Sequence, residues 1–471
     1  MRLSVRRSMR RTLALWFVLF GAYAATLGLD AFGDSDYGGD EPHYLLAAES
    51  LMDDGDVDVR DEYAGRAYRD FYPYELERHG EETEGRLNEP HGIGFPLFIL
   101  PAYAVGGPYG VELFLAAVAA LAGALAYRLA LRVVPDPWAI GAALAAGLSP
   151  PFLAYAGAVY PELSAGAALA GAALLAVRLD ARPGWRAGFA CFALLGALPW
   201  LGTKFVLPGL VIGAVAARGL WRAQRRTLAV GAVELSLFSV ALFVGINEAL
   251  YGGPTPYSAE IPGESATDAS FPGGYLDRAY RLVALFIDRE YGLLRWAPVF
   301  ALAFAGLWWL WRSLRDRLAQ AVPGVREIEL TAGLCAAALG AQLVVAGFLA
   351  PTMFGFWFPP RHLMASLLLA VPLVAWGLRH APRVGVALSA LTLAASAWLY
   401  VDVRWAGGSF VTERPDAPFG PLEDVFPLYG PDGGWAYWLA AAIGVAIAAL
   451  AVREARHSRQ AAGATRARYS G

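Results

Sequence analysis

The chain has 471 residues, of which 57% are hydrophobic and 17% charged, with a formal net charge of -3. This composition gives far more apolar surface than one soluble core can bury, so it excludes an ordinary soluble domain and indicates a membrane as the solvent. The small net charge conceals a separation of arginines from acidic residues along the chain. We expect no nucleic-acid partner.

The first predicted membrane helix covers residues 12–29, which contain no charged residue over 18 positions. At about 1.5 Å per residue, this length is sufficient for a hydrocarbon core of about 30 Å. No small-residue cleavage site precedes the acidic run that follows. We therefore expect a retained helix rather than a cleaved signal peptide.

Arginine clusters in short polar breaks predict the membrane topology. The positive-inside rule places all seven clusters on the cytoplasmic side, so the chain crosses the membrane an even number of times between successive clusters. This parity predicts about twelve transmembrane helices with both termini in the cytoplasm. The clusters lie at residues 2–11, 128–132, 178–186, 218–226, 312–326, 379–383 and 453–459.

The same parity divides residues 187–217, which have arginines at both ends, into two short helices. The turn between them falls at Gly202 and Thr203, and it places Lys204, the only lysine of the chain, at the outer surface. Cys191 and Cys335 both lie in apolar stretches, so they are predicted to pack as small residues rather than to form a disulfide.

The predicted fold class is an all-α polytopic membrane protein, a single transmembrane domain over residues 1–471 in the cell membrane. Its first extracytoplasmic loop, residues 31–96, contains interfacial helices and is the most acidic segment. Between residues 34 and 89 it has 18 Asp and Glu against five Arg. Further extracytoplasmic loops are predicted at residues 251–295, 351–362 and 402–434.

The first loop is predicted to contain an amphipathic helix on the membrane surface. Tyr44, Ala48 and Leu51 recur at i, i+4 and i+7, the spacing of one helical face. Asp40 is suited to cap the start of this helix, and the acidic run from Asp53 ends it. The loop then returns to the bilayer through a segment rich in glycine and proline.

The acidic pair Asp40–Glu41 just after the first helix, the long outer loop and the many-helix plan resemble the GT-C superfamily of membrane glycosyltransferases. Its mannosyltransferase-like and aminoarabinose-transferase-like branches use sugars linked to polyprenyl phosphate. The resemblance implies that the acidic pair supplies the catalytic base and, in some branches, a metal ligand. We expect Asp40 to take the proton of the acceptor hydroxyl, with Glu41 as its support. In the alternative interpretation, Asp40 only caps the helix and Glu41 only favours its dipole.

Sugar transfer from a lipid phosphate also needs positive charge or a metal at the departing phosphate. Arg361 and His362 follow an aromatic and proline-rich run and precede an apolar span. Arg361 could therefore bind phosphate, or it could be an interfacial anchor. Lys204 is a further candidate because an unused lysine is costly between two apolar helices. Arg289 and Arg295, in a charged cluster before a later span, could bind phosphate or acceptor unless that cluster pairs internally.

Polar and aromatic residues at the predicted outer side are candidates for a substrate cavity: His43, Tyr44, His91, Glu162 and Trp357. No cofactor is certain. A divalent metal, Mg²⁺ or Mn²⁺, could be held by Asp40, Glu41 and His91, although the spacing matches no established zinc pattern. Structural histidines held by hydrogen bonds are the alternative.

These features predict an inverting membrane glycosyltransferase for hexosyl or pentosyl transfer. The donor would be a polyprenyl-phosphate sugar, the acceptor a lipid, glycan or protein, and the active site extracytoplasmic, in contact with membrane lipids. The alternative is a secondary transporter or flippase of a lipid-linked or small substrate. The scarcity of ionisable residues at mid-membrane argues against a transporter. The sequence also has no P-loop, HExxH, GxSxG or paired CxxC motif that would favour another enzyme class.

Overall fold

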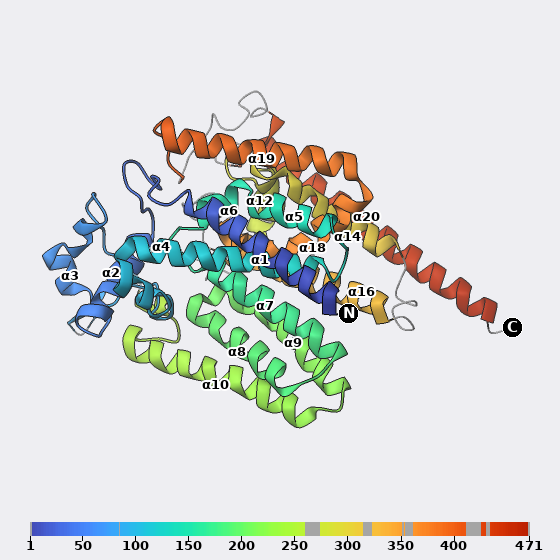
Figure 1. Ribbon diagram of the computed structural model, residues 1–471, viewed down its shortest axis with the longest axis horizontal. Coiled ribbons are helices and arrows are strands. Elements are labelled where there is room, and N and C mark those ends of the chain that lie inside the picture. The colour runs from blue at the N-terminus through green and yellow to red at the C-terminus, as the bar shows by residue number, and fades with distance from the viewer. Residues whose placement is uncertain are drawn as a thin grey trace.

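The computed structural model describes residues 2–83, 85–259, 274–313, 323–350, 353, 361–410, 425–429 and 434–469. Within these ranges almost all regular structure is helical. The exception is a two-stranded antiparallel sheet of β1 (Glu82–Thr83) and β2 (Arg86–Leu87). Most long helices follow the long axis of the molecule, and the first loop covers one end of them (Figure 1). The prediction of an all-α polytopic protein is confirmed.

Eight helices of the described ranges are long and apolar enough to cross a membrane. The other four predicted spans fall on helices that are shorter or more charged: α1 (Arg2–Ala24), α5 (Trp138–Gly147), α8 (Trp185–Leu201) and α14 (Ala301–Arg312). A multi-pass membrane protein is therefore supported, whereas the count of twelve spans stays a prediction. The eight candidate spans are Gly94–Ala130, Glu162–Ala181, Thr203–Arg222, Arg226–Ala259, Gly324–Leu349, Arg361–His380, Pro382–Trp405 and Gly434–Arg456.

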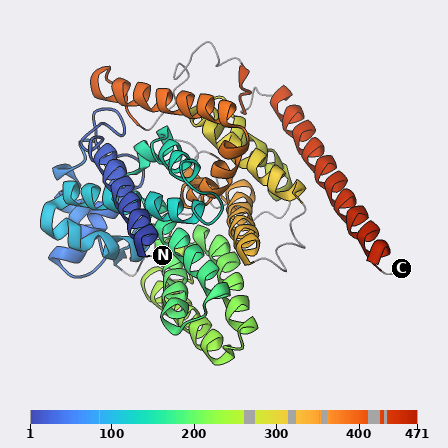
Figure 2. The same cartoon turned by 45° about the vertical axis from the view of Figure 1, so that its right-hand side comes forward.

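The alanine-rich helix α7 (Glu162–Ala181) lies at the centre of one helical group. Small residues such as alanine and glycine let neighbouring helix backbones approach closely, which is how helices pack where lipid removes the hydrophobic driving force. Helices α4, α8 and α9 contact α7 directly, and Figure 2 shows the green group of α7 to α10 on one side of the molecule. The bounds of these neighbouring helices are Gly94–Ala130 for α4, Val206–Arg222 for α9 and Arg226–Tyr251 for α10.

The later part of the chain supplies the other helices. Helix α18 (Val371–His380) is buried along most of its length and packs against α14 and α5. The further elements are α6 (Pro150–Tyr155), η2 (Thr203–Phe205), η3 (Pro256–Ala259), α11 (Gly274–Asp277), η5 (Arg278–Tyr280), α12 (Arg281–Ile287), α13 (Leu293–Trp296), η6 (Pro298–Phe300), α16 (Pro323–Val344), η7 (Val345–Leu349), η8 (Arg361–Leu363), α17 (Met364–Leu367), η9 (Leu368–Ala370), α19 (Pro382–Trp405) and α20 (Gly434–Tyr469).

The first loop folds into α2 (Glu41–Asp53), α3 (Arg60–Gly65) and η1 (Ala67–Asp70), followed by the β1–β2 hairpin. Helix α2 begins after Asp40 and ends at Asp53, as predicted. It is not an amphipathic surface helix, however, because nine of its 13 residues are buried. One side of α2 packs into the main core, while Leu46 on another side joins a small core within the loop.

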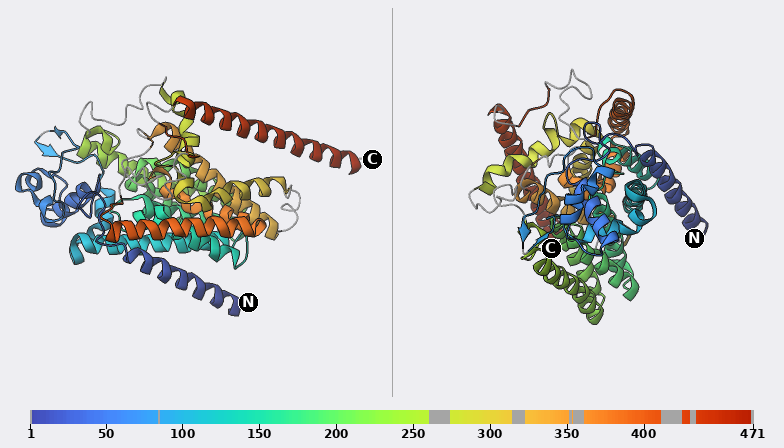
Figure 3. Two further views of the ribbon diagram at one scale, coloured as in Figure 1. Left: turned by 90° about the horizontal axis from the view of Figure 1, so that it is seen from above. Right: turned by 90° about the vertical axis from the view of Figure 1, so that its left-hand side faces the viewer.

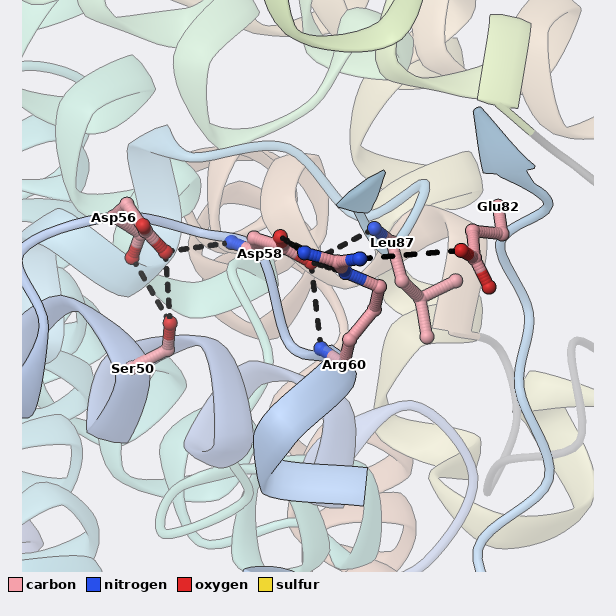
Figure 4. A network of polar contacts seen from close by, with 6 residues as sticks. All are labelled: Ser50, Asp56, Asp58, Arg60, Glu82 and Leu87. Atoms are coloured by element: carbon pink, nitrogen blue, oxygen red, sulfur yellow. Dashed lines mark hydrogen bonds and ion pairs between the residues drawn. The ribbon is translucent and has the colours of Figure 1, made fainter. Parts of the chain in front are cut away.

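A polar network fixes the β1–β2 hairpin against the segment between α2 and α3 (Figure 4). The Asp58 carboxylate accepts the backbone N–H of Leu87 at 2.8 Å and the Arg60 guanidinium at 2.9 Å. Arg60 also lies 4.0 Å from the Glu82 carboxylate. Strand β2 is thereby held in place immediately before the segment that returns to the helical bundle.

Both chain termini lie toward the end of the molecule that is away from the first loop (Figures 1 and 3). This arrangement is the one that the predicted topology requires, although the assignment of either side to the cytoplasm stays a prediction. Cys191 and Cys335 are free and buried, as expected for packing residues.

Candidate functional site

Asp40 forms an ion pair with a residue from the far end of the sequence. Its Oδ2 accepts a hydrogen bond from Nη2 of Arg361 at 2.5 Å, over a separation of 321 residues. Asp40 directly precedes α2, but its side chain makes no capping hydrogen bond to the described helix. The Asp40 carboxylate therefore binds an arginine and does not cap α2 through a side-chain hydrogen bond.

Arg361 joins Asp40 to a second carboxylate. Its Nε donates to Oε1 of Glu162 at 3.1 Å, and the same oxygen accepts a hydrogen bond from Nζ of Lys204 at 2.6 Å. Glu162 is the first residue of α7, Lys204 lies in the turn between α8 and α9, and Arg361 begins η8. We call these four residues, in the order Asp40, Arg361, Glu162 and Lys204, the ion network.

The ion network is largely shielded from solvent. The exposed fractions of the side chains are 1% for Glu162, 10% for Arg361, 20% for Lys204 and 23% for Asp40. Charges removed from water in this way are tolerated only when they are paired and hydrogen-bonded. Burial acts to raise the pKa of Asp40, but the Arg361 guanidinium outweighs it and holds this pKa well below its usual range. Asp40 is therefore a carboxylate at neutral pH, the form that can accept a proton.

Tyr160 holds both members of the Asp40–Arg361 pair. Its hydroxyl accepts the backbone N–H of Asp40 at 2.9 Å and donates to the carbonyl of Gly38 at 3.0 Å. Its ring lies 4.3 Å from the Arg361 guanidinium, within the range of a cation–π contact. Tyr160 was not a predicted site residue, and the signal that could have found it is its position just before Pro161 and Glu162.

Glu41 is buried and binds backbone amides. Its Oε2 accepts the N–H of Gly38 at 2.8 Å, and its Oε1 accepts the N–H of Val159 at 2.6 Å. Burial raises the pKa of Glu41 well above its usual value. Glu41 therefore connects the start of the first loop to the segment before α7, which is the geometry of a positioning residue.

Three histidines and a glutamate of the first loop form a second cluster. The possible ligand atoms of His43, His79, Glu89 and His91 all lie within 4.8 Å of one another. The Tyr63 hydroxyl donates to Glu89 at 2.6 Å and lies 3.0 Å from Nδ1 of His43. Burial lowers the pKa of His91 to about 4, so its ring is neutral at pH 7.

The predicted metal ligands Asp40, Glu41 and His91 are thus found in different surroundings. Arg361 binds Asp40, backbone amides bind Glu41, and His91 joins the histidine cluster. His79 was not a candidate in the sequence, because it lies in a polar stretch whose path across the loop is set only by the fold. Glu89, the remaining residue of the histidine cluster, lies two residues before His91 in the sequence.

A pocket lies beside both clusters. It is bounded by the returning segment of the first loop, the turn next to Lys204, α10 and η3. Asn247 is 1% exposed, and its Oδ1 has no hydrogen-bond partner among the described residues. The wall also includes His91, Trp200, Thr203, Phe243 and Tyr257.

Two more predicted cavity and phosphate residues lie close to this region. Tyr44 is buried, with its ring centroid 5.2 Å from that of His91 and 4.9 Å from that of Phe95. His362 is buried next to Arg361, and its carbonyl accepts a hydrogen bond from Gln342 at 2.7 Å. Trp357 lies outside the described residues.

Arg289 and Arg295 belong to a different local arrangement. Nε of Arg289 donates to the carbonyl of Phe426 at 3.3 Å, and Arg295 donates to the carbonyl of Arg289. The nearby Asp288 carboxylate accepts backbone N–H groups, including that of Tyr429 at 3.1 Å. One of these contacts lies within the cluster, and two join it to residues 426–429, so a role of Arg289 and Arg295 in binding phosphate or acceptor stays a prediction.

Comparison with known proteins gives a similarity in fold. No family model and no curated protein matches the chain. Among solved structures, apo ArnT from Cupriavidus metallidurans has a TM-score of 0.51 and 17% identity, over 95% of this chain and 72% of ArnT. The chain therefore has a fold similar to that of ArnT.

Two further structures have lower TM-scores. ArnT from the same organism bound to undecaprenyl phosphate has a TM-score of 0.47 and 17% identity, over 95% of this chain and 72% of ArnT. Archaeal oligosaccharyltransferase AglB from Archaeoglobus fulgidus, in complex with an inhibitory peptide and a dolichol-phosphate, has a TM-score of 0.44 and 12% identity. That match covers 88% of this chain and 59% of AglB.

Proposed function

We propose that this protein is an inverting membrane glycosyltransferase. It moves a sugar from a polyprenyl-phosphate donor to a lipid, glycan or protein acceptor on the extracytoplasmic side of the membrane. The observation that carries this proposal is the ion network, in which the first-loop carboxylate Asp40 lies against the cation Arg361, with Lys204 on the shared partner Glu162. ArnT, which has a similar fold, binds undecaprenyl phosphate, and we propose a lipid phosphate of this class as the carrier of the donor sugar.

Donor binding would rearrange the ion network. A phosphate anion competes with Asp40 for Arg361, because the planar guanidinium binds phosphate as well as carboxylate through two N–H groups. When Arg361 turns to the phosphate, Asp40 loses the charge that lowers its pKa, and its carboxylate becomes a stronger base. The step that binds the donor would therefore also prepare the base.

The transfer step then balances with groups of this chain. The acceptor hydroxyl oxygen attacks the anomeric carbon, its proton goes to Asp40, and the bond from the anomeric carbon to the phosphate oxygen breaks. The electron pair stays on the phosphate, whose added negative charge is stabilised by Arg361 and Lys204. Attack on the face opposite the phosphate inverts the configuration at the anomeric carbon.

In this proposal Arg361 and Lys204 stabilise the negative charge of the phosphate, which Mg²⁺ or Mn²⁺ could otherwise do. A metal on Asp40, Glu41 and His91 fits poorly, because Arg361 and backbone amides already bind the two carboxylates. We therefore propose Arg361 and Lys204 as the phosphate-binding groups and Glu41 as a positioning residue.

Two buried acceptor atoms support a place for a hydroxyl-rich ligand near the ion network. Oε2 of Glu162 and Oδ1 of Asn247 have no hydrogen-bond partner within the described ranges. Such atoms cost free energy unless a ligand or water donates to them. We propose that sugar hydroxyls bind there, and that Trp200 and Tyr257 on the cavity wall contact the sugar or the acceptor.

The test is a transfer assay with the purified full chain in liposomes. A panel of polyprenyl-phosphate-linked hexoses and pentoses, labelled in the sugar, would be offered with a membrane lipid extract as acceptor. Wild-type protein should move label to an acceptor, and Asp40→Asn should reduce the rate by about 100-fold or more. Asp34→Asn, at an exposed carboxylate of the same loop, is the matched control and should keep the wild-type rate.

The transporter or flippase alternative predicts another outcome. Labelled lipid-linked substrate would cross the liposome membrane without chemical transfer, and Asp40→Asn would leave that movement unchanged or change it without any glycosylated product. Movement of intact donor by wild-type protein in the absence of transfer would overturn the glycosyltransferase proposal.

A further inference from the structure

We propose that the first loop contains a structural divalent-metal site whose four ligands are His43, His79, Glu89 and His91, with Zn²⁺ as the preferred ion. This proposal does not depend on the proposed function. The four residues come from three parts of the loop: helix α2, the segment before β1, and the segment after β2. Their possible ligand atoms all lie within 4.8 Å of one another.

Two of the distances within the cluster are close to those of a tetrahedral site. A zinc ion with bonds of about 2.0 Å places its ligand atoms about 3.3 Å apart along the edges of the tetrahedron. Nδ1 of His79 lies 3.0 Å from Nε2 of His91, and Nδ1 of His43 lies 3.4 Å from Oε1 of Glu89. The remaining separations are no more than 4.8 Å, so binding one ion would draw these atoms closer together.

The chemical types of the ligands favour a transition metal over Mg²⁺ or Ca²⁺. Three imidazole nitrogens and one carboxylate oxygen form a typical donor set for Zn²⁺, whereas Mg²⁺ and Ca²⁺ prefer oxygen ligands. Four protein ligands leave no open position for water or substrate, which is the pattern of structural rather than catalytic zinc sites. The chain has only six histidines, and half of them are in this cluster.

The surroundings of the cluster hold the ligands in place. The Tyr63 hydroxyl donates to Glu89 at 2.6 Å, and the backbone N–H of His79 lies 3.2 Å from the other carboxylate oxygen. The rings of His43 and His79 are stacked, with centroids 4.0 Å apart. Outer contacts of this kind orient metal ligands in proteins and strengthen the site.

The position of the site gives the metal a specific role. His43 follows Asp40 by three residues at the start of α2, so the two lie on the same side of that helix. His91 is part of the wall of the cavity beside Lys204. A bound ion would therefore connect α2, which positions Asp40, to the cavity wall. The loop has no cysteine that could make this connection by a disulfide.

The competing interpretation is a set of hydrogen-bonded histidines that binds no metal. Metal content distinguishes the two, and it can be measured without any activity. The full chain would be purified with a tag that contains no histidine, washed with a weak chelator, and analysed by elemental mass spectrometry. We expect about one zinc per chain, retained through gel filtration.

Variants assign that metal to the cluster. His43→Ala and His79→Ala should each lose most of the zinc, whereas His380→Ala should keep it, because His380 lies at the C-terminal end of α18 and contacts the Trp376 carbonyl. His79 is only partly buried, so His79→Asn is a milder variant if an alanine variant fails to fold. Stripping wild-type protein with a strong chelator should lower its melting temperature, and Zn²⁺ but not Mg²⁺ should restore it.

Three results would overturn the metal site. They are wild-type protein that contains no transition metal and binds none when titrated with Zn²⁺, variants that keep the full metal content, and a melting temperature that does not respond to chelation. The Asp40→Asn variant should retain its zinc, so the metal proposal and the glycosyltransferase proposal can fail separately.

Discussion

Replacing Arg361 with alanine removes the centre of the ion network. The variant loses the hydrogen bonds to Asp40 and Glu162 and the contact with the Tyr160 ring. Asp40 is then left without its cation, while Glu162 retains Lys204. We expect the free energy of unfolding to fall as a result.

The size of this loss follows from burial. Removing one partner of a buried ion pair costs about 3 to 5 kcal/mol, because the other charge stays buried without compensation. Asp40 is 23% exposed and can recover some hydration, so we expect the lower end of that range, about 3 kcal/mol. Loss of the cation–π contact adds about 1 kcal/mol.

The matched control is Arg379→Ala. Arg379 belongs to the same apolar span, but it is exposed near the other end, where its guanidinium lies 5.9 Å from the Trp376 ring. Exposed interactions of this kind are worth little, so we expect a change within about 0.5 kcal/mol. Arg361→Lys should be intermediate, because lysine keeps the charge but cannot bind two carboxylates with a planar fork.

The assay is equilibrium or thermal unfolding of the detergent-solubilised protein, followed by tryptophan fluorescence. A double-mutant cycle with Asp40→Asn should give a coupling free energy of about 1 to 3 kcal/mol. Equal shifts for Arg361→Ala and Arg379→Ala, or a coupling near zero, would refute the reasoning from burial and pairing.

The pH dependence of this effect has a defined sign. The pKa of Asp40 is lower in the folded protein than in the unfolded chain, where it is about 3.9, so the ion pair stabilises the fold above that value. Its contribution is lost as the pH falls below the unfolded pKa. The difference between wild-type protein and Arg361→Ala should therefore stay constant from about pH 6 to about pH 8.

Two further variants test other parts of the site. Glu41→Ala leaves the buried N–H groups of Gly38 and Val159 without their acceptor and should lower the free energy of unfolding by about 3 kcal/mol. An unchanged melting temperature would show that these two hydrogen bonds do not hold the first loop in place. Lys204→Met removes one of the two cations and should weaken binding of polyprenyl phosphate about tenfold, measured by equilibrium binding in nanodiscs. An affinity equal to that of wild-type protein would exclude Lys204 from the phosphate site.

Much of the fold was predictable because it depends on local patterns. Helix α2 begins and ends where the sequence predicts, although the Asp40 side chain makes no capping hydrogen bond to the described helix. The turn between α8 and α9 follows from the arginines on either side of it. The burial of α2 was not predictable from its own sequence. Leu46 contributes to a small core formed by later parts of the loop, and only the tertiary structure shows that this core covers α2.

The candidate site was likewise predictable from the sequence only in part. Asp40, Arg361 and Lys204 stand out in the sequence because charged residues next to apolar spans are costly unless they are used or paired. Their mutual arrangement depends on contacts between segments more than 100 residues apart, so the shared role of Glu162 could not be deduced. Tyr160 is one tyrosine among 21, and only its contacts with Asp40 and Arg361 distinguish it.

The central claim is that Asp40 acts as the base in a site where Arg361 binds the donor phosphate. Its most direct test is to measure two quantities on the Asp40→Asn variant: the affinity for polyprenyl phosphate and the single-turnover rate of sugar transfer. The affinity should equal or exceed that of wild-type protein, because Arg361 no longer has a competing carboxylate, whereas the rate should fall by about 100- to 10,000-fold. Transfer by Asp40→Asn at the wild-type rate would contradict the account.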